Sequence, residues 1–124
     1  KLIRKNPDTK FHLLHGGFPW TEDTYALLHS FTNVWSDTCW LPYLSSRKAV
    51  EYIITALEVS DAFRLTWGCD AWMPEDSRGA LMAMEHTLAR ALGDMADDGA
   101  FDVPYAVYLA NRILYQNARD LFGI

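Results

Sequence analysis

The chain has 124 residues, half of them apolar, and its five Trp, six Tyr and six Phe are enough to build the core of one domain. The formal net charge is −5 and no basic cluster exceeds Arg47-Lys48, so the sequence offers no basic surface for nucleic acid or an anionic membrane. No apolar run approaches the roughly 20 residues of a membrane helix, and the N-terminal residues contain no signal-peptide core. We therefore expect a soluble protein that binds neither nucleic acid nor membranes.

The two cysteines, Cys39 and Cys69, are too few and too isolated for a disulfide framework or a four-ligand zinc site. Buried free thiols in a reducing compartment are the simpler interpretation. On this basis we expect a cytoplasmic protein.

The first half of the chain alternates short apolar segments with helical patterns. A buried strand is predicted over residues 10–15, and a helix capped by Thr21 follows it as far as residues 32–33. A second strand is predicted over residues 34–38. The next helix is predicted to start at Ser45 or Ser46 and to run to about Glu58.

The second half repeats this order once. A third strand is predicted over about residues 63–68, followed by a long helix that is capped by Ser77 and ends at residues 97–99. A last helix begins near Asp102 and runs to the final Leu-Phe-Gly. Strands that alternate with helices indicate parallel β/α units in an α/β fold, with both faces of the sheet covered.

Three strands are fewer than the five or so of an open sheet and the eight of a β/α barrel. We therefore expect residues 1–124 to be a single partial domain of a larger fold. Its partner would be a preceding N-terminal part or a second copy of the chain, which would make a homo-oligomer. Without that partner, two sheet edges and the apolar inner faces of the helices would be exposed.

Functional groups in parallel α/β folds gather at the carboxyl ends of strands. That rule selects residues 15–20, 37–40 and 68–72, and it predicts that His15 and Asp70 face a common mouth. The two-residue period of a strand places His12 on the opposite side from His15. Asp37 either orients a ligand or binds loop amides, and the sequence leaves both interpretations open.

Each candidate also has a structural interpretation. A single His after an apolar strand is often satisfied by a backbone carbonyl, and an Asp before a helix is often a cap. Asp70 is a poor cap because Ser77 lies closer to the helical pattern, which favours a functional role. Three tryptophans that follow strand ends pack against helices or form a weak substrate pocket: Trp20, Trp40 and Trp72.

The motif His15-Gly16-Gly17 is similar to the oxyanion loop of lipases and esterases. That activity is excluded because the chain has no G-x-S-x-G nucleophile motif and no Ser, acid and His in the required order.

A wider resemblance joins several of these segments. LLHGGFPW, VWSDTCWLP and RLTWGCDAWMPEDSRGAL, followed by a long helix and NRILYQNARDLFGI, resemble the last three strand units of amidohydrolase-related metal-dependent hydrolases. The similarity covers nearly the whole chain, and it is strongest to the branch that includes carboxylate-handling decarboxylases and the amidohydrolase-like domain joined to glutamine synthetase. It implies a distorted (β/α)₈ barrel with a divalent ion, Zn²⁺ or a similar metal, at its mouth. In that barrel the three strands would be the sixth, seventh and eighth.

The resemblance also assigns roles to two residues. Asp70 matches the acid at the end of strand eight, which touches the metal and takes a proton from the attacking water. His15 matches the histidine that ends strand six, which binds a metal or contacts the substrate. The His-x-His pair of strand one and the ligand of strand five have no counterpart in this chain, and His12 does not replace them.

These inferences give one main hypothesis. The chain is the carboxyl-terminal part of a metal-dependent hydrolase that attacks an amide- or ester-like carbon of a small molecule. Asp70 is then metal ligand and general base, and His15 is metal or substrate ligand. Decarboxylation or sugar-acid isomerisation on the same barrel is one alternative, and a catalytically inactive scaffold domain is another. Residues 1–124 alone are expected to be inactive.

Overall fold

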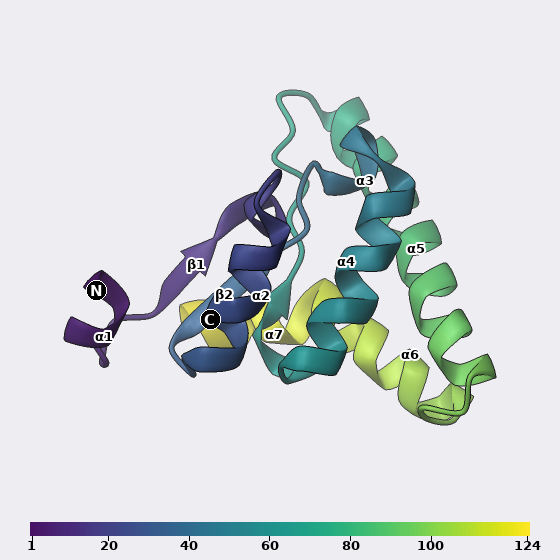
Figure 1. Ribbon diagram of the computed structural model, residues 1–124. Helices are drawn as coiled ribbons and strands as arrows, with labels where there is room; N and C mark the ends of the chain where they lie inside the picture. The colour runs from purple at the N-terminus through teal and green to yellow at the C-terminus, as the bar shows by residue number, and fades with distance from the viewer.

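Three parallel strands lie in the order β1-β2-β3, and helices connect them (Figure 1). The computed structural model describes all 124 residues. The elements in chain order are α1 (Leu2–Lys5), β1 (Phe11–Leu13), the 3₁₀ turn η1 (Leu14–Gly17), α2 (Thr21–Ser30), β2 (Val34–Asp37), α3 (Leu41–Leu44), α4 (Ser46–Val59), η2 (Ala62–Arg64), β3 (Leu65–Thr66), α5 (Pro74–Asp97), α6 (Val103–Asn111), the π-helical turn η3 (Arg112–Gln116) and α7 (Asn117–Phe122). The predicted α/β class and the order of elements are confirmed.

The strands are shorter than predicted. The strand expected over residues 10–15 ends at Leu13, because the backbone of His15 turns into the left-handed region at φ 59°. The strand expected over residues 63–68 is reduced to Leu65–Thr66, since a 3₁₀ turn takes up the residues before it.

The predicted helix starts are correct in two cases and wrong in two. Ser45 caps α4 by accepting the Lys48 amide at 3.2 Å, and Asp102 likewise caps α6. Thr21 is instead the first residue of α2, after Trp20 at the cap position. α5 begins at Pro74, three residues before the expected cap Ser77.

The early start of α5 has a local cause. Proline is favoured at the first helical position because its φ angle is already helical and it has no N–H to satisfy. The Ser77 hydroxyl donates to the Met73 carbonyl at 3.4 Å instead of accepting a helix amide. Asp70 lies four residues before Pro74 and does not cap the helix either.

Alternate strand residues face opposite sides of the sheet. On the helix side, the Tyr52 hydroxyl of α4 donates to Ser36 Oγ at 2.7 Å, and Leu65 is fully buried. Side chains of β1, β2 and β3 also meet on the other face, where His12 Nε2 lies 3.5 Å from Asp37 Oδ2. That second face therefore carries the side chains of His12, Asp37 and Thr66.

The amino end of the sheet is closed by polar side chains that satisfy buried carbonyls. Arg64, which is 9% exposed, donates from Nη1 to the carbonyls of Leu28, Phe31 and Val34 at 2.7–3.2 Å. Its Nε also donates to Asp61 at 2.8 Å. These contacts tie α2, β2 and β3 together at the end opposite to the candidate site.

The C-terminal helical segment also anchors at this amino end. Asn117, which is fully buried, donates from Nδ2 to the carbonyls of Ala62 and Leu65, both at 2.6 Å. Lys10 Nζ donates to the carbonyls of Asp120 and Leu121 in α7, both at 3.0 Å.

None of the helices combines the length and the apolar character that a bilayer span requires.

Candidate active site

A left-handed residue follows each of the three strands. His15 after β1 has φ 59°, Trp40 after β2 has φ 61°, and Asp70 after β3 has φ 47°. They are the three non-glycine residues of the chain with positive φ. Such conformations cost roughly 1–3 kcal/mol each, and they persist where surrounding contacts impose them, often at functional sites.

These three residues contact one another across the carboxyl ends of the strands. The indole N–H of Trp40 donates to the Asp70 carbonyl at 2.8 Å, and the Trp40 and His15 ring centroids lie 6.1 Å apart. His15 Nε2 lies 3.9 Å from Asp70 Oδ2. The structure thus brings together the two residues that the sequence pointed to, His15 and Asp70.

Glycines shape the turn that carries His15. Gly16 and Gly17 continue the left-handed backbone with φ 61° and 70°. A Cβ atom at Gly16 would lie 2.9 Å from the Tyr52 ring, and one at Gly17 would collide with the Thr24 hydroxyl. The His-Gly-Gly motif therefore serves a close-packed turn that leads from β1 into α2.

His15 and Asp70 fit a divalent cation by the chemistry of their donor atoms. Imidazole nitrogen and carboxylate oxygen bind Zn²⁺ at about 2.0–2.2 Å, so one ion can contact two such atoms that lie 3.9 Å apart. The side chains are 36% and 56% exposed, which leaves both atoms accessible.

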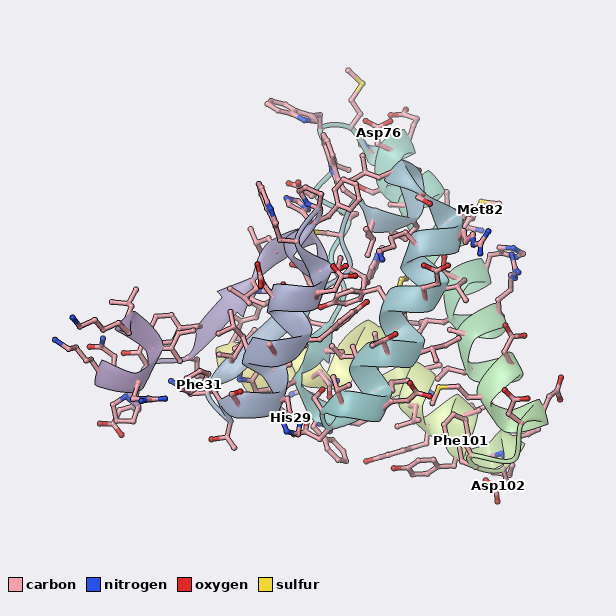
Figure 2. All side chains as sticks on the ribbon, in the orientation of Figure 1. His29, Phe31, Asp76, Met82, Phe101 and Asp102 are labelled. Atoms are coloured by element: carbon pink, nitrogen blue, oxygen red, sulfur yellow. The ribbon has the colours of Figure 1, made fainter.

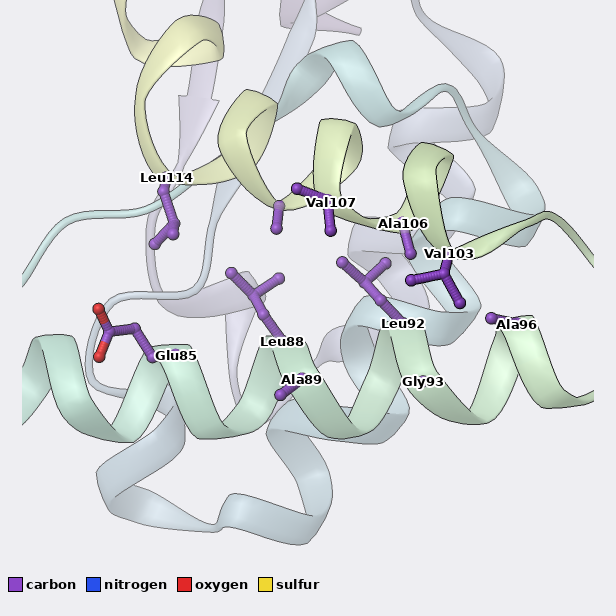
Figure 3. Close-up of a pocket in the computed structure, with 11 residues that line it drawn as sticks. Glu85, Leu88, Ala89, Leu92, Gly93, Ala96, Val103, Ala106, Val107 and Leu114 are labelled. Atoms are coloured by element: carbon purple, nitrogen blue, oxygen red, sulfur yellow. The ribbon is translucent and has the colours of Figure 1, made fainter.

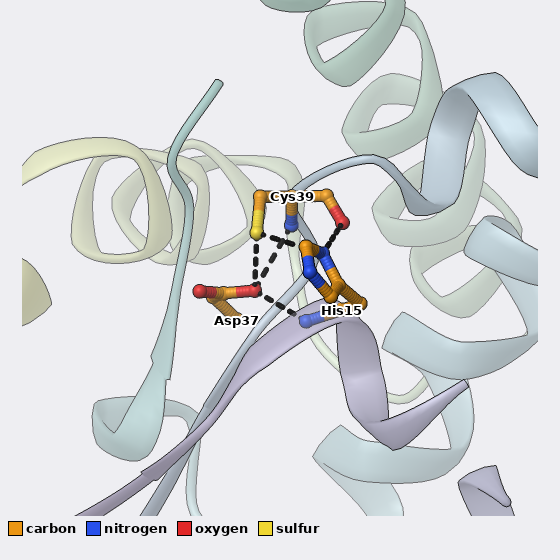
Figure 4. Close-up of side chains that lie close together, drawn as sticks. All are labelled: His15, Asp37 and Cys39. Carbon is orange, nitrogen blue, oxygen red and sulfur yellow. Dashed lines mark hydrogen bonds between the residues drawn. The ribbon is translucent and has the colours of Figure 1, made fainter. Parts of the chain in front are cut away.

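Asp37 lies close to His15 and Cys39 (Figure 4) and is 4% exposed. Its Oδ1 accepts the His15 backbone N–H at 2.8 Å, the Cys39 backbone N–H at 3.1 Å and the Cys39 thiol at 2.9 Å. Of the two interpretations that the sequence left open, binding of loop amides is the one observed. Asp37 thereby ties the carboxyl ends of β1 and β2 together.

His15, Asp37 and Cys39 also place three metal-ligating atoms within 4.8 Å of one another. This trio is a poor cation site, because Asp37 Oδ1 is already surrounded by hydrogen-bond donors. Burial, and next the neighbouring Asp37, raise the pKa of the Cys39 thiol to about 12, so the sulfur keeps its proton at neutral pH. Of the polar side chains at the strand ends, His15 and Asp70 thus remain the pair with accessible ligand atoms.

His12 is a residue that sequence reasoning set aside. Its Nε2 lies 2.9 Å from Thr66 Oγ1 and 3.5 Å from Asp37 Oδ2, and burial lowers its pKa more than the nearby Asp37 raises it. Strand alternation puts His12 and His15 on opposite sides only if the strand continues to His15, and β1 ends at Leu13. The register of β1 on β2 is the signal that places His12 on the face of Asp37.

A cavity of about 270 Å³ adjoins Asp70. Two of the three predicted pocket tryptophans line it, Trp40 and Trp72, together with Tyr43 and Leu44. Trp20 does not line this cavity and is 69% exposed at the start of α2, so its expected place in the pocket is not observed.

Both cysteines are free, as expected, but they differ in burial. Cys39 is buried, whereas Cys69 is partly exposed, which corrects the expectation of two buried thiols. A hydrogen bond with Ser77, and next the Ala71 backbone, lower the pKa of the Cys69 thiol.

Comparison with known proteins places the chain in a family. The family model described as "Amidohydrolase" matches residues 1–124. The chain belongs to the amidohydrolase family. Protein fluG of Emericella nidulans is 29% identical over 125 residues, which is 99% of this chain and 14% of that protein.

A solved structure shows the same fold. The chain of a protein from Lactobacillus casei ATCC 334, described as a metal-dependent hydrolase, matches with a TM-score of 0.74 and 23% identity. The match covers 98% of this chain and 33% of the other. This amidohydrolase chain thus spans about a seventh of one relative and a third of the other. The family and the fold support a metal-dependent hydrolase as the general class.

Proposed function

We propose that residues 1–124 supply the sixth, seventh and eighth strands of a (β/α)₈ barrel, and that this barrel hydrolyses an amide- or ester-like bond in a small molecule. The parallel order β1-β2-β3 and the family membership support this architecture. The cavity beside Asp70, with its aromatic walls, would take part of the substrate.

The observation that carries this proposal is the convergence of the three left-handed residues. Each has a positive φ, which is uncommon for residues other than glycine, and together they bring His15 Nε2 and Asp70 Oδ2 to 3.9 Å. Contacts between the loops impose positive φ at all three strand ends and leave both polar side chains accessible, and this combination supports a functional role for the pair.

His15 and Asp70 would hold a divalent cation, and we favour Zn²⁺ because imidazole and carboxylate are among its usual ligands. When bound, such an ion lowers the pKa of a water molecule toward 7 and so provides a nucleophile at neutral pH. The Asp70 carboxylate would accept the proton of the attacking water and pass it to the leaving group. His15 Nε2 completes the metal site or contacts the substrate oxygen that becomes negative.

Asp70→Asn in the complete barrel protein tests this proposal. Asn tolerates the left-handed backbone, so the substitution removes the charge and keeps the conformation. We expect weaker binding in a Zn²⁺ titration and a loss of turnover of roughly 10²–10⁴-fold. Asp94→Asn, at an exposed residue of α5 that does not line this cavity, is the matched control and should behave like the parent. An Asp70→Asn variant that binds Zn²⁺ and turns over like the parent would show that the assignment is wrong.

We also propose that the rest of the barrel is the partner of these residues. β1 and β3 each have an unpaired edge. An apolar groove of about 360 Å³ lies between α5 and α6, with Leu88, Leu92 and Leu114 among its lining residues (Figure 3). Exposed sheet edges and apolar grooves of this size favour association. A solution mass for residues 1–124 that corresponds to a well-folded monomer would contradict this proposal, and a mass of two chains would point to a second copy instead.

A further inference from the structure

The ring nitrogen Nδ1 of His15 faces only hydrogen-bond acceptors. It lies 3.1 Å from the Cys39 carbonyl oxygen, which has no proton to give, and 3.2 Å from Cys39 Sγ (Figure 4). The thiol hydrogen is directed to Asp37 Oδ1, which lies 2.9 Å from the sulfur and is the stronger acceptor. The sulfur therefore presents lone pairs to His15.

We propose that Asp37 sets the tautomer of His15, with the proton on Nδ1 and an unprotonated Nε2 that faces Asp70. Asp37 does so in two ways: it draws the thiol hydrogen away from the imidazole, and it holds the backbone N–H groups of His15 and Cys39 at one oxygen. The second contact keeps Nδ1 within hydrogen-bond distance of the Cys39 carbonyl. Asp37 is thus a positioning residue that acts through Cys39.

The orientation of Asp37 is itself fixed from the other side. The Thr66 hydroxyl donates to the Ser36 carbonyl at 3.3 Å, so its oxygen is free to accept from His12 Nε2 at 2.9 Å. His12 Nε2 also lies 3.5 Å from Asp37 Oδ2. Both carboxylate oxygens of Asp37 therefore face donors, which leaves one favourable orientation of the group.

The tautomer matters because the two ring nitrogens have different chemistry. An unprotonated Nε2 can bind a metal ion or accept a hydrogen bond, whereas a protonated one presents a hydrogen to the site. This consequence rests on the proposed function, but the tautomer itself does not. Residues that orient a metal-binding histidine in this way typically change metal affinity or activity 10- to 100-fold when they are replaced.

Nitrogen NMR on the metal-free complete protein, with ¹⁵N-labelled histidine, tests the proposal directly. At a pH where His15 is neutral, its resonances, assigned through their loss in His15→Gln, should show a protonated Nδ1 and an unprotonated Nε2. Asp37→Ala should shift population toward the Nε2–H form. Asp37→Leu, which has a similar shape and no acceptor, should give the same shift if the alanine variant does not fold.

Two further variants separate tautomer control from general stability. Cys39→Ser keeps a donor for Asp37 and an acceptor for Nδ1, so it should retain the parent spectrum of His15. Asp102→Ala is the matched control, because Asp102 also accepts a backbone N–H, that of Tyr105. Asp102 lies at the opposite end of the molecule from Asp76 and the start of α5 (Figure 2), so this substitution should leave the His15 spectrum unchanged.

The proposal is overturned if the parent carries the proton on Nε2, or if a folded Asp37→Ala variant keeps the parent spectrum. If the tautomer is as proposed and Asp70→Asn retains full metal binding and turnover, then the hydrolase assignment fails while the tautomer assignment stands. In a Zn²⁺ titration of the complete protein, Asp37→Ala should bind the ion 10- to 100-fold more weakly than the parent.

Discussion

Trp40 donates its indole N–H to the main-chain carbonyl of Asp70 at 2.8 Å, across 30 residues of sequence. This contact joins the loops that follow β2 and β3, and both residues have left-handed backbones. The tryptophan therefore holds the Asp70 loop in place in addition to lining the adjoining cavity.

Trp40→Phe removes the donor and keeps an aromatic ring. We expect a loss of about 1 kcal/mol in the free energy of unfolding, because one intramolecular hydrogen bond is lost. Turnover should fall by about tenfold as the Asp70 loop loosens. Urea unfolding and steady-state kinetics on the complete protein measure the two effects. Trp72→Phe, at a residue 90% exposed, is the control and should change stability by less than about 0.5 kcal/mol.

Asp70→Gly separates backbone strain from charge. Glycine adopts positive φ without penalty, so we expect the free energy of unfolding to rise by about 0.5–1 kcal/mol although activity is lost. A stability gain with loss of function is the pattern expected of a strained active-site residue. Differential scanning calorimetry would show a higher melting temperature than for Asp70→Asn. Equal melting temperatures for the two variants would mean that φ 47° stores no strain at this position.

The sequence predicted the positions of functional groups better than the contacts that hold them. The order of elements and the strand-end rule were sufficient to select His15 and Asp70, because both depend on local patterns and strand direction. The left-handed conformations of His15, Trp40 and Asp70 were not predictable. They are imposed by contacts between loops, whereas local preference favours negative φ for all three residue types.

His12 and the helix start at Pro74 show two other limits. The two-residue alternation of side chains holds only within a strand, and β1 ends at Leu13, two residues before the predicted end, so the alternation does not place His15 relative to His12. At α5, the sequence contained two start signals, Pro74 and Ser77, and propensity alone did not rank them.

Cys69 is expected to react with iodoacetamide and Cys39 is not. Cys69 is partly exposed and its pKa is lowered, first by the hydrogen bond with Ser77. Cys39 is buried, and burial together with Asp37 raises its pKa to about 12, so it has almost no thiolate at pH 7.5. Mass spectrometry of the native protein should show one added label, which Cys69→Ser abolishes and Cys39→Ser does not. Two labels at comparable rates would contradict the buried thiol.

Arg64→Met should destabilise the fold by about 3 kcal/mol. The substitution preserves apolar volume but leaves the buried carbonyls of Leu28, Phe31 and Val34 without their donor. Arg64→Lys should lose less, because it keeps the charge but lacks the planar set of donors. Urea unfolding measures both, and Arg90→Met, on the exposed side of α5, should change stability by less than about 0.5 kcal/mol. A loss at Arg64 as small as at Arg90 would show that these carbonyls find other partners.

His12 should make the stability of the protein depend on pH between neutrality and mild acid. Burial holds its pKa below the 6.5 of the unfolded chain, so the unfolded state binds more protons in the range between the two values. The free energy of unfolding therefore rises with pH across that range. The contribution of His12 is fully present above about pH 6.5 and is lost as the pH falls through its folded pKa, with a slope of up to about 1.4 kcal/mol per pH unit.

Urea unfolding at a series of pH values from 5 to 8 measures this contribution. The parent should lose more stability on acidification than His12→Gln, which cannot titrate at this position. His86→Gln removes an exposed histidine of α5 and serves as the reference for the loss of one imidazole. Parallel pH profiles for the parent and His12→Gln would mean that His12 binds its proton equally well in the folded and unfolded states. The Thr66 and Asp37 contacts would then not hold a neutral imidazole in the sheet.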